Sequence, residues 1–312
     1  MILVSGGTGF VGRVLVRQLV NAGHRVRLLI RPSQQSPNVP RGVSVEVAVA
    51  GLEDVRGLRA AMRGVDVVYH LAGSEQRGAR ARLYDVDVRG TANMAQAAAD
   101  AAVERFCYVS HLGADRAAGY PVMKAKGIAE DHIRKSGVPY TIFRTAVLFG
   151  PEDHFTTALA RLAHSFPVIF VPSGNPLLQP LWVEDLGTAM LWSLDNPHTL
   201  NQTYELGGSE YFDFRQIVET VLDKMGKSRL ILPLSLSSMR ALTVLLEYSL
   251  PGFPTSTFWI DYLSVNRTCR VDSVPRQFGF MPARFAYRLD YLTAPNWWQR
   301  LRQTLRQPEK HA

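Results

Sequence analysis

Short apolar runs alternate with windows of helical spacing through the first half of the chain. The apolar runs have the length and composition of β-strands and lie at 2–5, 25–30, 43–49, 65–72, 105–110 and 140–144. The helical windows between them cover 11–22, 54–63, 85–102 and about 121–136. Nearly continuous apolar strands that alternate with helices are typical of a parallel sheet covered on both faces. The pattern therefore predicts a doubly wound α/β fold.

Several helix boundaries are marked by residues that begin or end helices. Gly23 follows the first helical window, and Ser136 with Gly137 closes the fourth. Later in the chain, Asp213 stands three residues before Gln216. This spacing predicts a capping box at the start of a helix.

The pattern loosens in the second half of the chain, where proline and glycine become frequent between the helices. We expect a nucleotide-binding domain over 1–150 that also uses 183–196. The remainder, 151–312, is expected to form a smaller, irregular α/β lobe that holds the substrate and ends in an amphipathic tail.

Composition narrows the classes of function. The chain has 312 residues, 46% of them hydrophobic, which is enough for a large core. Its two cysteines, Cys107 and Cys269, are too few for a disulfide framework and lack metal-ligand spacing, so no metal site is expected. Cys107 lies in an apolar run and is expected to be a buried structural thiol.

Charge and hydropathy bear on partners and location. The formal net charge is +8 and the pI is about 9.6, which suits either an arginine-rich surface or an anionic partner. No nucleic-acid module is recognisable, so no nucleic-acid partner is expected. The chain opens on a strand-like run and has no apolar run long enough to span a membrane. We expect a cytoplasmic protein, with association at the inner face of a membrane left open.

A glycine array separates the first strand from the first helix. Gly6, Gly9 and Gly12 form a G-x-x-G-x-x-G motif in "GGTGFVG". Glycines at this place let the backbone approach a pyrophosphate, while the helix N-terminus supplies unpaired N–H groups. The motif predicts a dinucleotide site.

The charges after the second strand indicate which dinucleotide is bound. An NAD site usually has an acidic residue there, but no aspartate or glutamate precedes Glu46. Arg31 stands at the end of the second strand, and Arg13 directly follows the glycine array. A guanidinium suits a 2′-phosphate and a carboxylate would repel it. The sequence favours NADP(H), with NAD(H) as the alternative.

Several motifs together resemble the short-chain dehydrogenase/reductase superfamily, in its extended and atypical branches. The motifs are "GGTGFVG", "GVDVVYHLAG", "DVDVRGTANMAQAA", "FCYVSHLGAD", "YTIFRTAVLFGPEDHF" and "PLWVEDLGTAML". The resemblance is strongest to NmrA-like proteins and to the nucleotide-binding accessory subunit of respiratory complex I. It implies a Rossmann sheet, and cofactor contacts from Gly6, Thr8, Gly9, Phe10, Val11, Gly12, Arg13, Arg31, Leu52, Leu71, Ala72, Gly73 and Lys126.

In this superfamily a tyrosine phenol transfers the proton, and a lysine one helical turn later lowers its pKa and holds the ribose. Tyr120 and Lys124 match the motif Y-x-x-x-K. Counting back from the glutamate that follows the lysine in related sequences instead puts Lys126 in the lysine position and Val122 in the tyrosine position. Pro121 also suits the first position of a helix and pushes the residue before it out of helical geometry. Lys126 is the favoured cofactor lysine, and Tyr120 remains an alternative acid.

Other positions of the implied site depart from the family pattern. Ser110 fits the strand that usually ends in a catalytic serine, but His111 follows it where a second serine is common. His111 is a candidate to replace the missing acid. Asp87 stands where the resemblance expects asparagine, and Thr145 stands where it expects proline.

The second lobe and the tail offer weaker candidates. The resemblance places His154, Phe155, Gln179 and Trp182 near the cleft. In the tail, helical spacing puts Trp298, Leu301 and Leu305 on one apolar face. The residues around this face include Arg300, Arg302 and Arg306. This pattern predicts docking on a protein partner, on a membrane surface, or on the domain itself.

Two hypotheses follow. The first is an NADP-dependent oxidoreductase, or an epimerase- or dehydratase-like enzyme, acting on a small organic substrate. The second is a catalytically inert NADP(H)-binding accessory or regulatory subunit of a larger complex.

Overall fold

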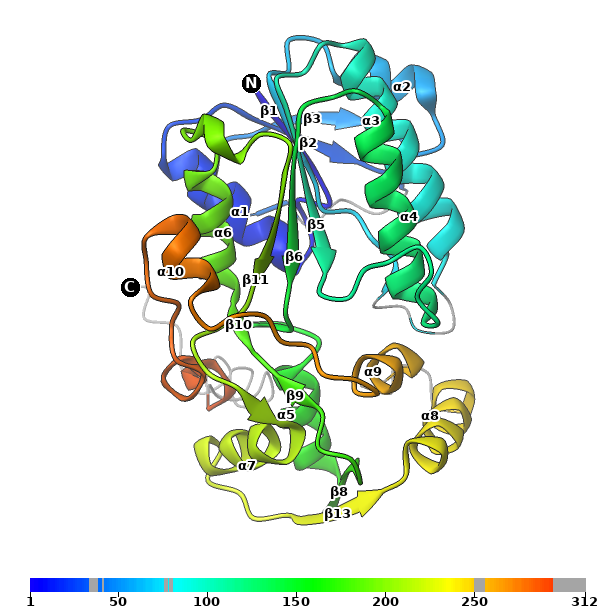
Figure 1. Ribbon diagram of the computed structural model, residues 1–312, viewed down its shortest axis with the longest axis vertical. Helices are drawn as coiled ribbons and strands as arrows, with labels where there is room; N and C mark the ends of the chain where they lie inside the picture. Colours follow the sequence, from blue (N-terminus) through cyan, green and yellow to red (C-terminus); the bar gives the residue numbers. More distant parts are fainter. Residues whose placement is uncertain (34–38, 41, 76–77, 79–80, 250–255, 294–312) are drawn as a thin grey trace, which may run out of the picture.

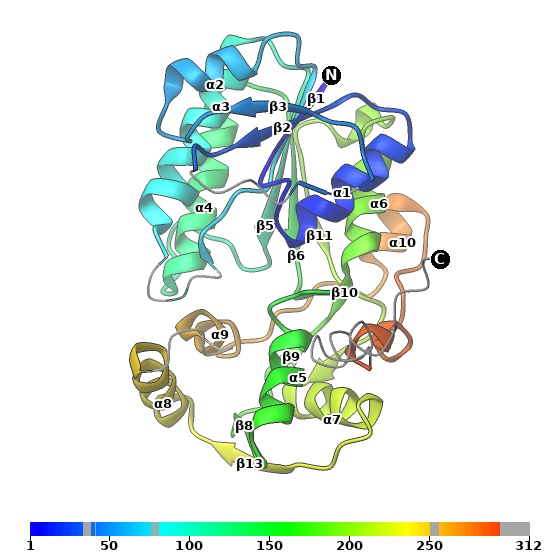
Figure 2. The same cartoon turned by 180° about the vertical axis from the view of Figure 1, so that it is seen from behind.

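A computed structural model describes residues 1–33, 39–40, 42–75, 78, 81–249 and 256–293. The chain forms a Rossmann-type domain, with a smaller lobe beyond one end of its sheet (Figures 1 and 2). The predicted tail over 295–312 lies outside the described residues.

Seven parallel strands form the main sheet in the order β11-β6-β5-β4-β1-β2-β3. The strands are β1 (Ile2–Ser5), β2 (Val26–Ile30), β3 (Glu46–Val49), β4 (Val67–His70), β5 (Arg105–His111), β6 (Tyr140–Thr145) and β11 (Gln202–Leu206). The predicted doubly wound parallel sheet is confirmed. β11 was not predicted, and it comes from the second half of the chain to pair with β6.

Helices cover both faces of the sheet (Figure 1). One face carries α1 (Phe10–Asn21), α6 (Val183–Trp192) and α10 (Ser273–Phe278). The other face carries α2 (Val55–Ala61), α3 (Gly90–Asp100) and α4 (Pro121–Lys135), and a π-helical turn over Leu83–Arg89 leads into α3. Because successive strand residues point to opposite faces, the inner strands β6, β5, β4, β1 and β2 contribute to both cores. In β5, Phe106 packs with the α2–α4 layer and Cys107 with the α1–α6 layer.

The second lobe is built from short elements. Its helices are α5 (Thr156–Ser165), α7 (Phe214–Lys224), α8 (Leu236–Ser249) and α9 (Thr257–Tyr262). Its strand pairs are β13 (Leu230–Leu234) with β8 (Val168–Pro172), β12 (Phe212–Asp213) with β9 (Leu177–Leu178), and β10 (Leu181–Trp182) with β7 (Leu148–Phe149). A separate hydrophobic core holds these elements together, with the exception of α8.

Local predictions at two helix ends are confirmed. Asp213 and Gln216 form the predicted capping box at the start of α7. Pro121 is the first residue of α4, and Tyr120 precedes the helix with φ −95° and ψ 127°.

Cys107 is fully buried as expected, and burial raises its pKa to about 12, so this thiol stays protonated.

Candidate functional site

The glycine loop joins β1 to α1 beside the end of β4. Gly6 has φ +73°, and a Cβ there would lie 2.7 Å from the backbone nitrogen of Ala72. A Cβ on Gly12 would collide with the carbonyl oxygen of Gly6. The loop is therefore compact because both positions lack side chains. The first N–H groups of α1 have no partner within the helix, so this N-terminus fits a phosphate.

A cavity of about 290 Å³ opens at this loop and continues along the carboxyl ends of the central strands. Ligands of open α/β sheets bind at such strand ends. The cavity is lined by residues of the glycine loop, the strand ends, α4 and the second lobe; they include Gly6, Gly9, Phe10, Val11, Gly12, Leu71, Gly73, Glu75, Val109, His111, Lys126, Thr145, His154, Phe155, Phe258, Trp259 and Tyr262.

Lys126 reaches this cavity from α4 as a buried cation, with 5% of its side chain exposed. Its Nζ lies 3.3 Å from Oδ1 of Asp87, 3.7 Å from Oε2 of Glu75 and 5.4 Å from the centre of the Tyr108 ring. Burial opposes the charged ammonium, but the two carboxylates outweigh it and raise the pKa of Lys126. Lys126 is thus a fixed positive charge beside the glycine loop.

The pKa values of the two carboxyl groups are shifted in opposite directions. Burial raises the pKa of Asp87 above its usual range, although Lys126 acts against this. Asp87 also accepts hydrogen bonds from the backbone N–H and the hydroxyl of Ser74, so its remaining oxygen is the one that faces the lysine. Burial acts on Glu75 in the same sense, but Lys126 and His111 together hold its pKa well below the usual range. Glu75 is therefore ionised at neutral pH.

His111 lies at the end of β5, where it lines the cavity next to Glu75. Its Nε2 is 3.7 Å from Oε1 of Glu75. Its Nδ1 is buried and has no hydrogen-bond partner in the part of the chain that the structure describes. Burial lowers the pKa of His111, and Glu75 offsets part of this effect. The ring thus presents one free nitrogen and one nitrogen backed by a carboxylate.

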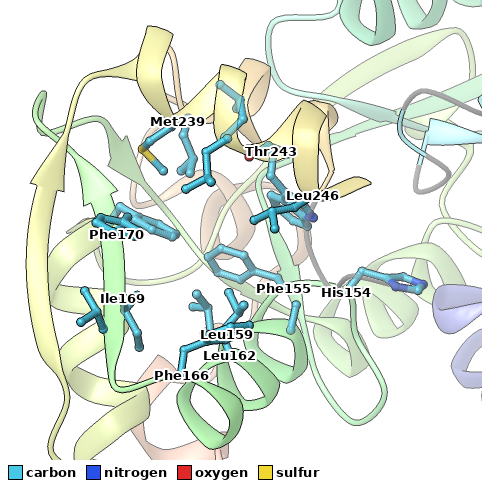
Figure 3. Close-up of a pocket in the computed structure, with 17 residues that line it drawn as sticks. His154, Phe155, Leu159, Leu162, Phe166, Ile169, Phe170, Met239, Thr243 and Leu246 are labelled. Carbon is cyan, nitrogen blue, oxygen red and sulfur yellow. The ribbon is translucent and has the colours of Figure 1, made fainter. Parts of the chain in front are cut away.

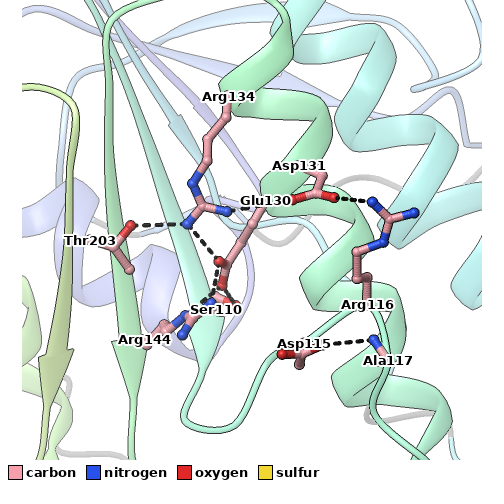
Figure 4. A network of polar contacts seen from close by, with 9 residues as sticks. All are labelled: Ser110, Asp115, Arg116, Ala117, Glu130, Asp131, Arg134, Arg144 and Thr203. Atoms are coloured by element: carbon pink, nitrogen blue, oxygen red, sulfur yellow. Dashed lines mark hydrogen bonds and ion pairs between the residues drawn. The ribbon is translucent and has the colours of Figure 1, made fainter.

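Ser110, the neighbouring candidate, is not among the residues that line the cavity. Its hydroxyl donates to Oε1 of Glu130 at 2.7 Å, and the same carboxylate accepts hydrogen bonds from Arg134 and Arg144 (Figure 4). Because side chains alternate along a strand, Ser110 points away when Val109 and His111 line the cavity. Its polar contacts tie α4 to β5 and β6.

The two lysines of α4 lie in different surroundings. Lys124 is exposed and is absent from the cavity, whereas Lys126 is buried beside it. Val122 is 6% exposed and belongs to the core of the second lobe. Tyr120 packs at the edge of that core, 5.9 Å from the Arg267 guanidinium, and lines a separate hollow. The structure does not bring Tyr120 or Lys124 to the cavity.

The predicted cofactor contacts at the adenosine end lie in three segments. Arg31 is exposed directly after β2. Arg13 is engaged by Glu152, with 2.6 Å between Nη2 and Oε2. Leu52 is buried after β3, and its carbonyl accepts a hydrogen bond from Asn93.

The other predicted positions divide between the cavity wall and the surrounding framework. Thr8 and Ala72 belong to the loops after β1 and β4 but do not line the cavity. His154 and Phe155 do line it. Gln179 instead is fully buried and bonds to the Gly208 carbonyl and the Cys269 backbone N–H, so it braces loops of the second lobe. Trp182 packs against Phe149 and also lies outside the cavity wall.

Two residues that line the cavity, Glu75 and Tyr262, were not predicted from the sequence. Glu75 lies in the loop after β4, five residues beyond the end of the strand, and Tyr262 is the last residue of α9. Tyr262 is 1% exposed, and its hydroxyl has no hydrogen-bond partner among the described residues. Its ring lies edge-on to His111 at 6.1 Å, and the Arg267 guanidinium lies 5.4 Å from its centre. Burial raises the pKa of this phenol, so it stays a hydrogen-bond donor at neutral pH. The aromatic residues within 258–262 were the feature of the sequence that could have pointed to Tyr262. Their position over the strand ends, however, depends on tertiary packing.

No helix in the described ranges is both long and apolar enough to cross a membrane.

Comparisons with known proteins agree with this geometry. A subunit of Arabidopsis thaliana, NADH dehydrogenase (ubiquinone) 1 alpha subcomplex subunit 9, mitochondrial, is 28% identical over 227 residues, which cover 70% of this chain and 56% of that protein. A ceramide reductase of Caulobacter vibrioides is 32% identical over 191 residues, 61% of this chain and 60% of that protein. This chain thus matches somewhat more than half the length of each.

The fold is shared with a crystal structure of an NADPH-dependent quinone oxidoreductase from Escherichia coli complexed with NADPH. The TM-score is 0.75 at 19% identity, with 94% of this chain and 99% of that chain covered. The predicted resemblance to the short-chain dehydrogenase/reductase superfamily is confirmed. A family model described as NAD(P)H-binding matches residues 6–164, more than half of the chain, which therefore belongs to this NAD(P)H-binding family.

Proposed function

We propose that this protein is an NADP(H)-dependent oxidoreductase that reduces a carbonyl group of a small organic substrate. The main support is one cavity in which the glycine loop, the buried Lys126 and the His111–Glu75 pair meet. A reductase needs a place for the dinucleotide and a proton donor at the same carbonyl. The name of the Caulobacter relative, a reductase, agrees with this reaction class.

The chain's own residues fit the dinucleotide in three places. The loop with Gly6, Gly9 and Gly12 would hold the pyrophosphate at the start of α1. Lys126 would donate to the nicotinamide ribose. Arg31 would pair with the 2′-phosphate, because Arg13 is already engaged by Glu152. When bound, NADPH supplies the hydride.

The proton would come from His111. Glu75 would stabilise the protonated ring through Nε2, and Nδ1, which has no partner among the described residues, would donate to a substrate oxygen. The phenol of Tyr262 would orient that oxygen by donating a hydrogen bond. The site thus uses an imidazole where the resemblance implies a tyrosine, since the position of that tyrosine on α4 is taken by the core residue Val122.

The cofactor assignment predicts the behaviour of Arg31→Asp. The dissociation constant of NADPH should rise about 10- to 100-fold, because a charge-assisted hydrogen bond worth roughly 1.5–3 kcal/mol is lost and a like charge is added. The dissociation constant of NADH should change by no more than about 2-fold, since the 2′-phosphate is the only group concerned. Titration of each nucleotide by calorimetry measures both values.

Arg161→Asp on α5 makes the same change of net charge at an exposed position of the second lobe. It should leave NADPH affinity unaltered. An Arg31→Asp protein that still binds NADPH as the parent does would remove the basis for NADP(H) preference.

A second function is favoured by one observation: Val122 fills the expected tyrosine position and faces the lobe core. An inert NADP(H)-binding accessory subunit needs the glycine loop and Lys126 but no proton donor. The name of the Arabidopsis relative is that of a subunit of a larger complex. In this case the chain would have a protein partner, and the dinucleotide would be a structural ligand.

Turnover separates the two functions. Purified protein is mixed with NADPH and a panel of aldehydes, ketones and quinones, and the absorbance of NADPH is monitored. If the protein is a reductase, at least one of these compounds should cause NADPH to be consumed. Binding of NADPH with no consumption across the panel, together with capture of a stoichiometric protein partner, would favour the accessory subunit.

A further inference from the structure

A second cavity of about 350 Å³ lies in the smaller lobe, enclosed by α5, β8, α8 and α9 (Figure 3). Its size falls in the range of roughly 300–1,000 Å³ that is usual for small-molecule sites. Apolar side chains form nearly all of its wall; examples are Leu159, Leu162, Phe170, Met239, Leu242 and Leu246. Among the described residues of the wall, the side chains with polar groups are His154, Thr243 and Trp259, the last through its indole N–H.

This apolar cavity adjoins the cavity at the glycine loop. His154, Phe155 and Trp259 line both of them. The rings of Phe155 and Trp259 stack with centroids 5.2 Å apart, so they form the wall between the two spaces. A molecule that spans this wall would have one end beside His111 and Tyr262 and the other end among aliphatic and aromatic side chains.

The wall chemistry restricts the ligand. Apolar cavities of about half this volume stay dry and take up apolar molecules. A charged group would lose its hydration here, because none of the described residues that line the apolar cavity carries a carboxylate, ammonium or guanidinium. The other end differs: the residues that line it include His111, Tyr262 and Glu75, whose side chains carry polar groups. The two spaces together suit an amphiphile with an uncharged chain.

We propose that the substrate is a carbonyl compound with a long apolar chain, acyl or isoprenoid in kind, whose carbonyl lies at His111 and Tyr262 and whose chain fills the cavity between α5 and α8. This inference rests on the proposed reductase function and specifies its substrate class. Affinity then depends mainly on chain length, since each buried methylene contributes about a 4-fold gain in binding.

Two probes test whether the cavity between α5 and α8 binds an apolar chain, one by binding and one by turnover. Binding of 11-(dansylamino)undecanoate is measured by fluorescence without NADPH. NADPH oxidation is measured with methyl ketones from 2-butanone to 2-tridecanone. We expect the probe to bind, longer ketones to displace it better, and the Michaelis constant to fall by about 2- to 4-fold per methylene until the cavity is filled.

A matched pair of variants on α8 localises the effect. Leu242 lines the cavity, whereas Leu245 is 62% exposed on the same helix and does not line it. Leu242→Trp should fill the space and weaken probe binding about 50-fold, the equivalent of about three methylenes excluded. Leu245→Trp should bind the probe like the parent. The dissociation constant of NADPH should be the same in both variants.

The outcomes are distinguishable. Ketone reduction that is independent of chain length would show that the cavity between α5 and α8 does not bind the apolar chain of the substrate, and it would still support the reductase function. Chain-dependent binding without NADPH oxidation by any ketone would overturn the reductase function and leave the apolar site. If Leu242→Trp alters only the oligomeric state in analytical ultracentrifugation, the cavity is a protein interface and the proposal is wrong.

Discussion

Lys126→Met is expected to lower the free energy of unfolding by about 3–5 kcal/mol at neutral pH, because removal of one partner leaves buried charges without compensation. The lysine is 5% exposed and is the shared cation of Glu75 and Asp87. Both carboxylates would then face each other in a low-dielectric site. Urea unfolding, followed by circular dichroism, measures the change.

The loss should depend on pH. At present Lys126 and His111 hold the pKa of Glu75 low against the opposing effect of burial. Without the lysine, the folded-state pKa of Glu75 rises above its unfolded value of roughly 4, and that of Asp87, which burial already raises, rises further. A raised carboxyl pKa costs nothing below the unfolded value, and the cost grows as pH rises toward the folded value. The stability difference between parent and variant should therefore be smaller at pH 5 than at pH 8.

Lys124→Met is the matched control. It removes the same charge from an exposed position two residues away on α4, so its effect should stay within about 0.5 kcal/mol. The double variant Lys126→Met with Glu75→Gln should recover part of the loss. Equal effects of the two single substitutions would contradict the burial of Lys126.

The Rossmann half was predictable because its signals are local. Apolar strands, helical spacing and end residues such as Gly23 and Gly137 depend on neighbours a few positions away. The start of α4 at Pro121 was predictable for the same reason, and two positions on a helix of 3.6 residues per turn put Lys124 and Lys126 on opposite faces. The choice of Lys126 over Lys124 came from the spacing of the family's motif.

The remaining parts of the molecule depend on long-range packing. β11 joins the sheet beside β6 from about 60 positions later in the chain. Ser110 was a candidate by motif, but strand alternation and Glu130 direct its hydroxyl into an ion-pair network. Tyr262 reaches His111 only because α9 folds back over the strand ends. None of these placements has a local signature.

This distinction explains why the proton donor could not be predicted from the sequence. The motif drew attention to Tyr120, which the fold places in a different hollow beside Arg267. The cavity wall offers other groups that can donate, among them His111 and Tyr262. Burial raises the pKa of the phenol and lowers that of the imidazole, so the imidazolium is the stronger acid of the two.

We therefore expect His111→Asn to reduce kcat by about 10²- to 10⁴-fold, the usual contribution of a positioned general acid, with little change in NADPH affinity. In the parent, kcat should rise as pH falls through the pKa of His111, because donation requires the protonated ring and burial lowers that pKa below its usual 6.5. The variant should lose this pH dependence. Ser110→Ala, at the adjacent position, should weaken stability through Glu130 but keep the pH profile. If instead Tyr262→Phe abolishes turnover while His111→Asn does not, the phenol carries the proton and the imidazole only shapes the cavity.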